Sequence, residues 1–215
     1  MWRFRGISLA LTFGGFLFPR YLLLYRMARK TSTFWYLFSK FWFRITGWRL
    51  GPQVPPNIKK SMMIAAPHTS NWDFMFARAA FFLMDVDVKL TIKKEWTTIP
   101  VLGALVRSLG GLAVDRSKNN SLVDGMVQLF KEREELVILI TPEGTRAYQP
   151  KWRKGFYHAA LGAGVPILLG YLDYKNKEAG VGPAFWPTGD YEKDLEEIKA
   201  FYRTKQGRFP EKGVR

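Results

Sequence analysis

Two short segments carry the residue types that acid–base chemistry and anion binding need. Residues 67–73 read Pro-His-Thr-Ser-Asn-Trp-Asp and place His68 five residues before Asp73. If Asp73 accepts a hydrogen bond from one imidazole nitrogen, the other nitrogen can take a proton from a hydroxyl group. Residues 141–146 read Thr-Pro-Glu-Gly-Thr-Arg and end in Arg146, whose guanidinium could hold a phosphate. Together they predict proton abstraction beside an anion-binding loop.

Each segment, taken alone, also has a plainer explanation. His68 could be a histidine satisfied at the start of a helix, with Asp73 a first-turn acid favoured by the helix dipole. On an unbroken helix residues five apart point about 140° from each other, so the pair meets only if the chain turns between them. Residues 143–146 could be an ordinary turn between a strand and a helix, with a surface arginine.

Other candidate groups carry weaker signals. The segment 110–116 is a short strand between glycines and an Asp-Arg pair, so Arg116 could bind an anion or pair with its surroundings. Lys94 is solvated by default, and we interpret His158 as structural because it has no nearby carboxylate. The chain has no Gly-x-Ser-x-Gly elbow, P-loop or Gly-x-Gly-x-x-Gly, which weakens serine hydrolase, NTPase and dinucleotide-binding hypotheses.

The elements that must position these residues alternate between strand and helix. We expect strands over 62–66, 88–92, 112–114, 136–140 and 165–169, and helices over 71–84, 100–109, 119–133, 154–163 and 190–205. This alternation predicts an α/β fold, a largely parallel central sheet flanked by helices. Ligands of such sheets lie outside the carboxyl ends of the strands. Both motif segments start at expected strand ends, so we expect them at one edge.

Composition narrows the function further. The 215 residues include no cysteine and two histidines, so disulfides, thiolate catalysis and cysteine- or histidine-rich metal sites are not expected. The net charge is +15, and residues 1–72 carry eleven Lys or Arg and no acid. A basic, aromatic-rich segment without acids is typical of contact with an anionic membrane surface; nucleic acid is the other common anionic partner.

The N-terminal part predicts a membrane-binding element. Residues 7–18 are mostly apolar but shorter than the roughly 20 residues of a spanning helix, and no cleavage site closes them as in a signal peptide. Over 20–46 a helical wheel separates a basic face from an aromatic face. The helix either packs on its own domain or lies in the lipid interface, and we favour the interface because acids are missing. We divide the chain into a membrane-anchoring element, 1–50, and a catalytic domain, 51–215.

The ordered set of motifs resembles the 1-acylglycerol-3-phosphate acyltransferase (lysophospholipid acyltransferase) family. That family has four blocks, which match His68 and Asp73; Lys93 to Glu95 with Gly110 to Arg116; Pro142 to Arg146; and Val165 to Ile167. Ala113, Val114, Thr141 and Leu169 depart from the usual residues. The resemblance implies a glycerolipid acyltransferase-like α/β domain and an N-terminal two-helix membrane element.

The resemblance also implies roles. His68 would be the general base and Asp73 its orienter. The substrate-binding residues would be Lys94, Arg116, Glu143, Gly144, Thr145 and Arg146. An acyl group would pass directly from acyl-CoA or acyl carrier protein to a lysophospholipid hydroxyl, with no metal or other cofactor. We expect a membrane-associated, monotopic protein on the cytoplasmic face that contacts anionic lipids and binds no nucleic acid.

Three alternatives remain at this point. The acceptor could be a hydroxyl compound other than 1-acylglycerol-3-phosphate. The chain could be a non-catalytic protein that binds anionic lipids through a vestigial site. More weakly, its basic N-terminus could bind RNA, although it has no signature of an RNA-recognition module.

Overall fold

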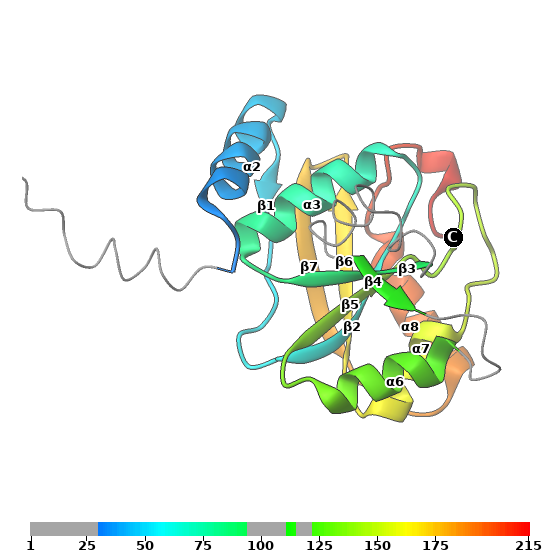
Figure 1. The fold of residues 1–215 in the computed structure, drawn as a ribbon. Coiled ribbons are helices and arrows are strands. Elements are labelled where there is room, and N and C mark those ends of the chain that lie inside the picture. The colour runs from blue at the N-terminus through cyan, green and yellow to red at the C-terminus, as the bar shows by residue number, and fades with distance from the viewer. Residues whose placement is uncertain (1–29, 94–110, 115–121) are drawn as a thin grey trace, which may run out of the picture.

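The computed structural model describes residues 30–93, 111–114 and 122–215, with helices on both faces of a sheet (Figure 1). The described helices are α2 (Thr33–Thr46), α3 (Trp72–Met84), α6 (Leu122–Glu132), α7 (Gly155–Ala163), α8 (Tyr191–Arg203) and the short 3-10 helix η1 (Pro210–Lys212). The described strands are β1 (Arg49–Leu50), β2 (Lys60–Ala65), β3 (Val88–Lys93), β4 (Gly111–Val114), β5 (Leu136–Ile140), β6 (Ile167–Asp173) and β7 (Glu178–Phe185).

The strands form one sheet in the order β1-β7-β6-β2-β5-β3-β4. Strands β6, β2, β5, β3 and β4 are mutually parallel, whereas β7 runs antiparallel to β6 and pairs with β1 in parallel. The largely parallel sheet expected from the sequence is therefore confirmed. Because Ile64 of β2 lies beside Ile140 of β5, these two strands end together and their following loops emerge side by side.

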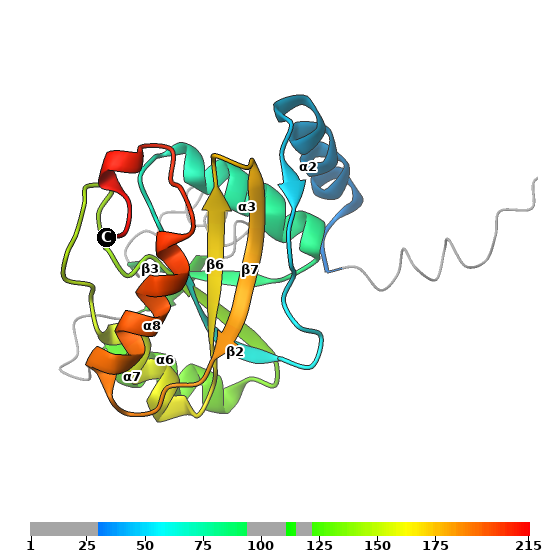
Figure 2. The same ribbon diagram turned by 180° about the vertical axis from the view of Figure 1, so that it is seen from behind.

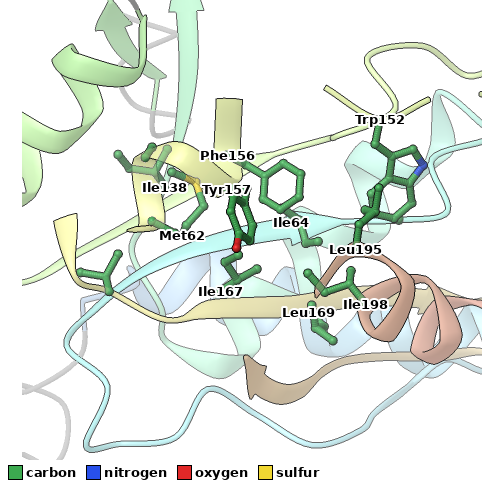
Figure 3. Packing of buried hydrophobic residues seen from close by; sticks show 14 of the residues in the cluster. Met62, Ile64, Ile138, Trp152, Phe156, Tyr157, Ile167, Leu169, Leu195 and Ile198 are labelled. Atoms are coloured by element: carbon green, nitrogen blue, oxygen red, sulfur yellow. The ribbon is translucent and has the colours of Figure 1, made fainter. Parts of the chain in front are cut away.

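The pleat of β2 directs alternate side chains into two apolar layers. Met62 and Ile64 pack with residues of α6, α7 and α8, while Met63 packs on the opposite face with Phe81 of α3. Figures 1 and 2 show α6, α7 and α8 gathered on one side of the sheet and α2 with α3 on the other. Figure 3 shows the first layer from close by, with Phe156 of α7 among the strand residues.

Most expected elements are present, but β7 was missed. Its sequence, EAGVGPAF, holds two glycines and a proline, which ordinarily weaken a strand. The glycines have a packing reason: a Cβ on Gly180 would lie 2.6 Å from the Tyr171 hydroxyl, and one on Gly182 would overlap the Phe201 ring. The glycines leave room for bulky side chains of β6 and α8, and the strand is held by its pairing with β6 and β1.

The expected continuous helix over 20–46 is wrong at residues 30–32. There the backbone N–H groups of Lys30 and Thr31 donate to the carboxylate of Asp85, and Ser32 caps the helix by accepting from Trp35 N. Helix α2 therefore begins at Thr33. Residues 20–29, the expected helix over 100–109 and the apolar segment 7–18 lie outside the described residues.

The boundary at residue 50 stays a prediction. On its N-terminal side α2 lies against α3, with Ser39 and Phe43 buried, and Trp48 stacks on Phe76 of α3 with ring centroids 4.3 Å apart. The two residues of β1 then extend the sheet at its β7 edge.

Candidate active site

The loop after β2 brings His68 and Asp73 together. Residues 66–71 turn before α3 begins, so the two side chains are not held at helical spacing. His68 Nδ1 lies 3.0 Å from Asp73 Oδ2. Asp73 sits in the first turn of α3 and is 6% exposed. The sequence left open whether His68 pairs with Asp73 or is only a histidine at the start of a helix. In the structure the two side chains pair.

Asp73 is held by four donors. Its Oδ2 accepts from His68 Nδ1 and from the backbone N–H groups of Thr69 and Ser70, at 2.9 and 3.0 Å, and its Oδ1 accepts from the Tyr174 hydroxyl at 2.7 Å. Burial raises the pKa of Asp73, but the hydrogen bonds from His68, Tyr174 and Ser70 outweigh it and leave the pKa below its usual value. An ionised Asp73 keeps the imidazole proton on Nδ1, so Nε2 is the nitrogen available to accept a proton from a substrate.

Glu143 lies on the other side of His68. It follows β5, is 4% exposed, and its Oε2 accepts from the His68 backbone N–H at 2.7 Å. Burial raises the pKa of Glu143 to about 7, although the hydrogen bond from His68 works in the opposite direction. The contact ties the loop after β2 to the turn after β5 at the shared edge of the sheet.

A pocket of about 190 Å³ opens beside the His68–Asp73 pair. Its walls are mainly apolar, and its polar part consists of His68, Asp73, Thr141 and two arginines, Arg78 and Arg146. Apolar lining residues come from α3, the strands of the sheet and the loops at their ends: Ala65, Ala66, Pro67, Phe74, Ala77, Phe81, Val88, Leu90, Leu139 and Leu172. Such a pocket suits a ligand with a hydrocarbon part and an anionic or polar part.

Arg78 was not expected from the sequence. It lies five residues after Asp73 on α3, about 7.5 Å farther along the helix axis, and its guanidinium carbon is 4.4 Å from the centroid of the Phe82 ring. Its Nε is buried and has no hydrogen-bond partner among the described residues. Burial lowers its pKa, and the charge of Asp87 partly opposes this. Nothing in the spacing of the motif marked it, because the sequence alone does not show which side of α3 lines the pocket.

The remaining predicted site residues divide into three groups. Arg146 lies at the pocket and is exposed. Gly144 and Thr145 shape the turn: Gly144 has φ +66, with the Arg153 side chain packed over it, and Thr145 Oγ1 accepts from Ala147 N. Two further predicted residues, Lys94 and Arg116, lie outside the described residues.

The comparison with protein families decides the family. A sequence model of the family described as Acyltransferase matches residues 49–168, more than half of the chain. The chain belongs to this acyltransferase family. The matched segment contains His68, Asp73 and the turn with Glu143 and Arg146, so membership accounts for the central elements of the site. It does not include β7, α8 or the C-terminal residues.

Curated relatives of this chain carry a more specific name. The 1-acyl-sn-glycerol-3-phosphate acyltransferase of Salmonella typhimurium is 35% identical over 109 residues, 48% of this chain and 43% of the relative. The Escherichia coli protein of that name is 34% identical over 109 residues, with the same coverage, and the Haemophilus influenzae protein is 30% identical over 123 residues, 54% of this chain and 49% of the relative. The matched part thus spans about half the length of these relatives.

A solved structure supports the fold. The 1-acyl-sn-glycerophosphate (LPA) acyltransferase PlsC from Thermotoga maritima aligns with a TM-score of 0.54 and 16% identity, covering 84% of this chain and 83% of that one. At this identity the likeness concerns the fold. It extends beyond the segment matched by the family model, so it includes parts of the chain that sequence comparison leaves unmatched.

Two kinds of feature are absent from the described residues. Within 30–93, 111–114 and 122–215, no helix is both long and apolar enough to cross a bilayer. The same residues hold no cluster of three or more His, Asp or Glu side chains arranged to bind a metal ion.

Proposed function

We propose that this acyltransferase moves a fatty acyl group from an acyl thioester to the hydroxyl of a lysophospholipid such as 1-acylglycerol-3-phosphate. The observation that carries the proposal is the His68–Asp73 pair at 3.0 Å on the wall of an apolar pocket that also holds Arg146. The names of the relatives from Salmonella, Escherichia and Haemophilus support the choice of acceptor.

In the proposed reaction His68 is the general base and Asp73 its orienter. The acceptor hydroxyl gives its proton to Nε2 while its oxygen attacks the carbonyl carbon of the thioester. The carbon–sulfur bond then breaks, and the imidazolium returns the proton to the departing thiolate. The products are an ester and a free thiol. Attack is direct, so no acyl-enzyme forms and the reaction as written uses no metal.

Arginine side chains would hold the acceptor phosphate. Arg146 lies on the pocket that His68 lines, and Arg78 adds a second guanidinium whose Nε lacks a partner among the described residues. A guanidinium binds phosphate oxygens through paired N–H groups, which suits a phosphate monoester. Lys94 and Arg116 would complete this set, as the family motif implies. Glu143 would support the loop of His68 from behind instead of touching the substrate, because it is buried and already accepts from His68 N.

The apolar face of α2 would rest on an anionic membrane. Phe34, Leu37, Phe41 and Ile45 are between 57 and 67% exposed, and the helix contains Lys40 and Arg44 but no acid. Aromatic side chains in the headgroup region, with basic ones meeting lipid phosphate, are the usual arrangement of an interfacial helix. The lipid acceptor would then enter from the membrane, and the protein would be monotopic on the cytoplasmic face.

The acyl donor would be acyl-CoA or acyl carrier protein. Both are anionic, so the excess of basic residues does not choose between them. An assay with each donor in turn decides between them, because only the donor that is used releases its free thiol.

The deciding experiment compares purified wild-type protein with His68→Ala. Each is incubated with labelled acyl-CoA or acyl carrier protein and a panel of lysolipids, and the products are read by mass spectrometry. We expect acylation of a phosphate monoester by wild type, and at least a roughly 100-fold lower rate for His68→Ala. A variant that keeps more than about a tenth of the rate would refute the base role. Binding to anionic vesicles without acylation of any lysolipid would favour the non-catalytic lipid binder.

A further inference from the structure

The carboxylate of Asp73 receives a hydrogen bond from a part of the chain that the family match does not include. His68, Thr69 and Ser70 all donate to Oδ2, whereas Oδ1 accepts from the Tyr174 hydroxyl at 2.7 Å. Tyr174 lies in the turn between β6 and β7, beyond the matched residues 49–168. The loop and α3 fix one oxygen of Asp73, and Tyr174 fixes the other.

Tyr174 is itself held in place by packing. Its ring lies edge-on to Trp48, with centroids 4.9 Å apart, and edge-on to Phe76 of α3, with centroids 5.9 Å apart. Its backbone N–H donates to Gln206 O at 2.9 Å. A hydroxyl on a side chain held in this way can set the plane of the carboxylate that it contacts, because both side chains also make other contacts.

The residues after α8 close over the same loop. Phe209 N donates to Thr69 Oγ1 at 3.2 Å, and Gly207 packs so tightly that a Cβ there would lie 2.8 Å from Thr69. Arg208 faces the Tyr174 hydroxyl and lies with its guanidinium carbon 5.5 Å from the centroid of the Trp72 ring. In Figure 1 the C-terminal segment lies beside the start of α3, which agrees with these contacts.

We propose that Tyr174, seated by residues 206–209, is a positioning residue that orients Asp73, and through Asp73 the base His68. The inference rests on the proposed acyl transfer for its kinetic part. Tyr174 would not touch the substrate. It would fix the plane of the carboxylate that accepts from His68 Nδ1. The imidazole would then stay oriented with Nε2 toward the acceptor hydroxyl.

The charges around Asp73 define the expected pH behaviour. His68 comes from the loop after β2, Glu143 from the turn after β5, Tyr174 from the β6–β7 turn and Arg208 from the segment after α8. The Tyr174 hydrogen bond is among the contacts that lower the pKa of Asp73. Without it the Asp73 carboxylate should take up a proton at higher pH than in wild type.

The test is Tyr174→Phe, which keeps the ring and removes the hydroxyl. Tyr171→Phe is the matched control, because the Tyr171 hydroxyl, three residues earlier on β6, donates to Glu178 at 2.6 Å and does not contact Asp73. We expect Tyr174→Phe to lower kcat about tenfold, with little change in the KM of the donor or of the acceptor. A wild-type kcat in Tyr174→Phe would overturn the proposal, as would an equal loss of kcat in Tyr171→Phe.

A second measurement does not depend on activity. Carboxyl carbon NMR of protein labelled at aspartate, with Asp73→Asn used to assign the Asp73 resonance, follows the ionisation of Asp73 directly. We expect the titration midpoint of Asp73 to rise in Tyr174→Phe and to stay unchanged in Tyr171→Phe. An unchanged midpoint in Tyr174→Phe would overturn the proposal. If wild type transfers no acyl group but the midpoint rises, the proposed function fails while the positioning contact stands.

Discussion

The backbone N–H of His68 donates to Glu143 Oε2 at 2.7 Å, although 75 residues separate them in the chain. This contact joins the two loops that end β2 and β5, and it places a buried carboxyl group directly behind the residue we propose as the base. Glu143 can therefore support the loop of His68 from behind without facing the pocket.

The ionisation of Glu143 should make stability depend on pH. Burial raises its pKa to about 7, from a usual value near 4.5. Between those values the folded protein holds a proton that the unfolded chain has lost, so the free energy of unfolding should fall as pH rises, by on the order of 2 kcal/mol. Glu143→Gln stays neutral and should lack this fall. Urea unfolding of wild type and Glu143→Gln at pH 5 and pH 7.5 measures this fall. An equal change in the free energy of unfolding of both proteins between the two pH values would contradict the prediction.

Arg146 should act mainly on acceptor binding. Removing its guanidinium from the pocket leaves the acceptor phosphate with fewer N–H donors, so Arg146→Ala should raise the acceptor KM by roughly tenfold or more. The donor KM should change little. Steady-state kinetics with each substrate varied in turn provides the check, with exposed Arg133→Ala as the charge-matched control. A change confined to the donor KM would move Arg146 to the other substrate.

Arg78→Met should weaken recognition of a phosphate monoester while preserving the fold. The methionine keeps an unbranched apolar side chain against Phe82 but removes the charge from the pocket wall. We expect the preference for a lysophosphatidate acceptor over its phosphate methyl ester to fall by about tenfold, since a phosphate dianion gains most from a second guanidinium. Competition between the two acceptors in one reaction measures that preference. An unchanged preference would exclude Arg78 from the phosphate site.

The exposed face of α2 should govern membrane attachment. Replacing Phe34 and Phe41 by serine removes two large side chains from the face that we propose lies in the lipid interface, so binding to anionic vesicles should weaken by at least tenfold. Leu161→Ser on α7 is the control, because that leucine is also exposed but lies across the sheet from α2. Sedimentation with vesicles of mixed phosphatidylglycerol and phosphatidylcholine gives the binding curves. Equal binding by all three proteins would refute the proposed face.

Much of the fold followed from local pattern. Apolar runs such as 136–140, each followed by a helix, predicted parallel strands, and the structure confirms them as β5 and its neighbours. The pattern did not show β7, because glycines ordinarily weaken a strand. Here they make room for Tyr171 of β6 and Phe201 of α8, which the local sequence of β7 does not reveal. The pattern also extended α2 too far, because the capping by Ser32 and the contacts of Asp85 with residues 30 and 31 interrupt an otherwise helical periodicity.

For the site, the sequence by itself determined which chemistry was available: one histidine and one aspartate across a turn, and a Glu-Gly-Thr-Arg segment after a strand. Those residue types and their order sufficed for the acyltransferase family. Only the tertiary structure decided that Glu143 faces the back of the loop, that Arg78 lines the pocket and that Tyr174 completes Asp73. The physical reason is that each of these depends on which strands are neighbours, and strand order is set by packing of the whole sheet instead of by local spacing.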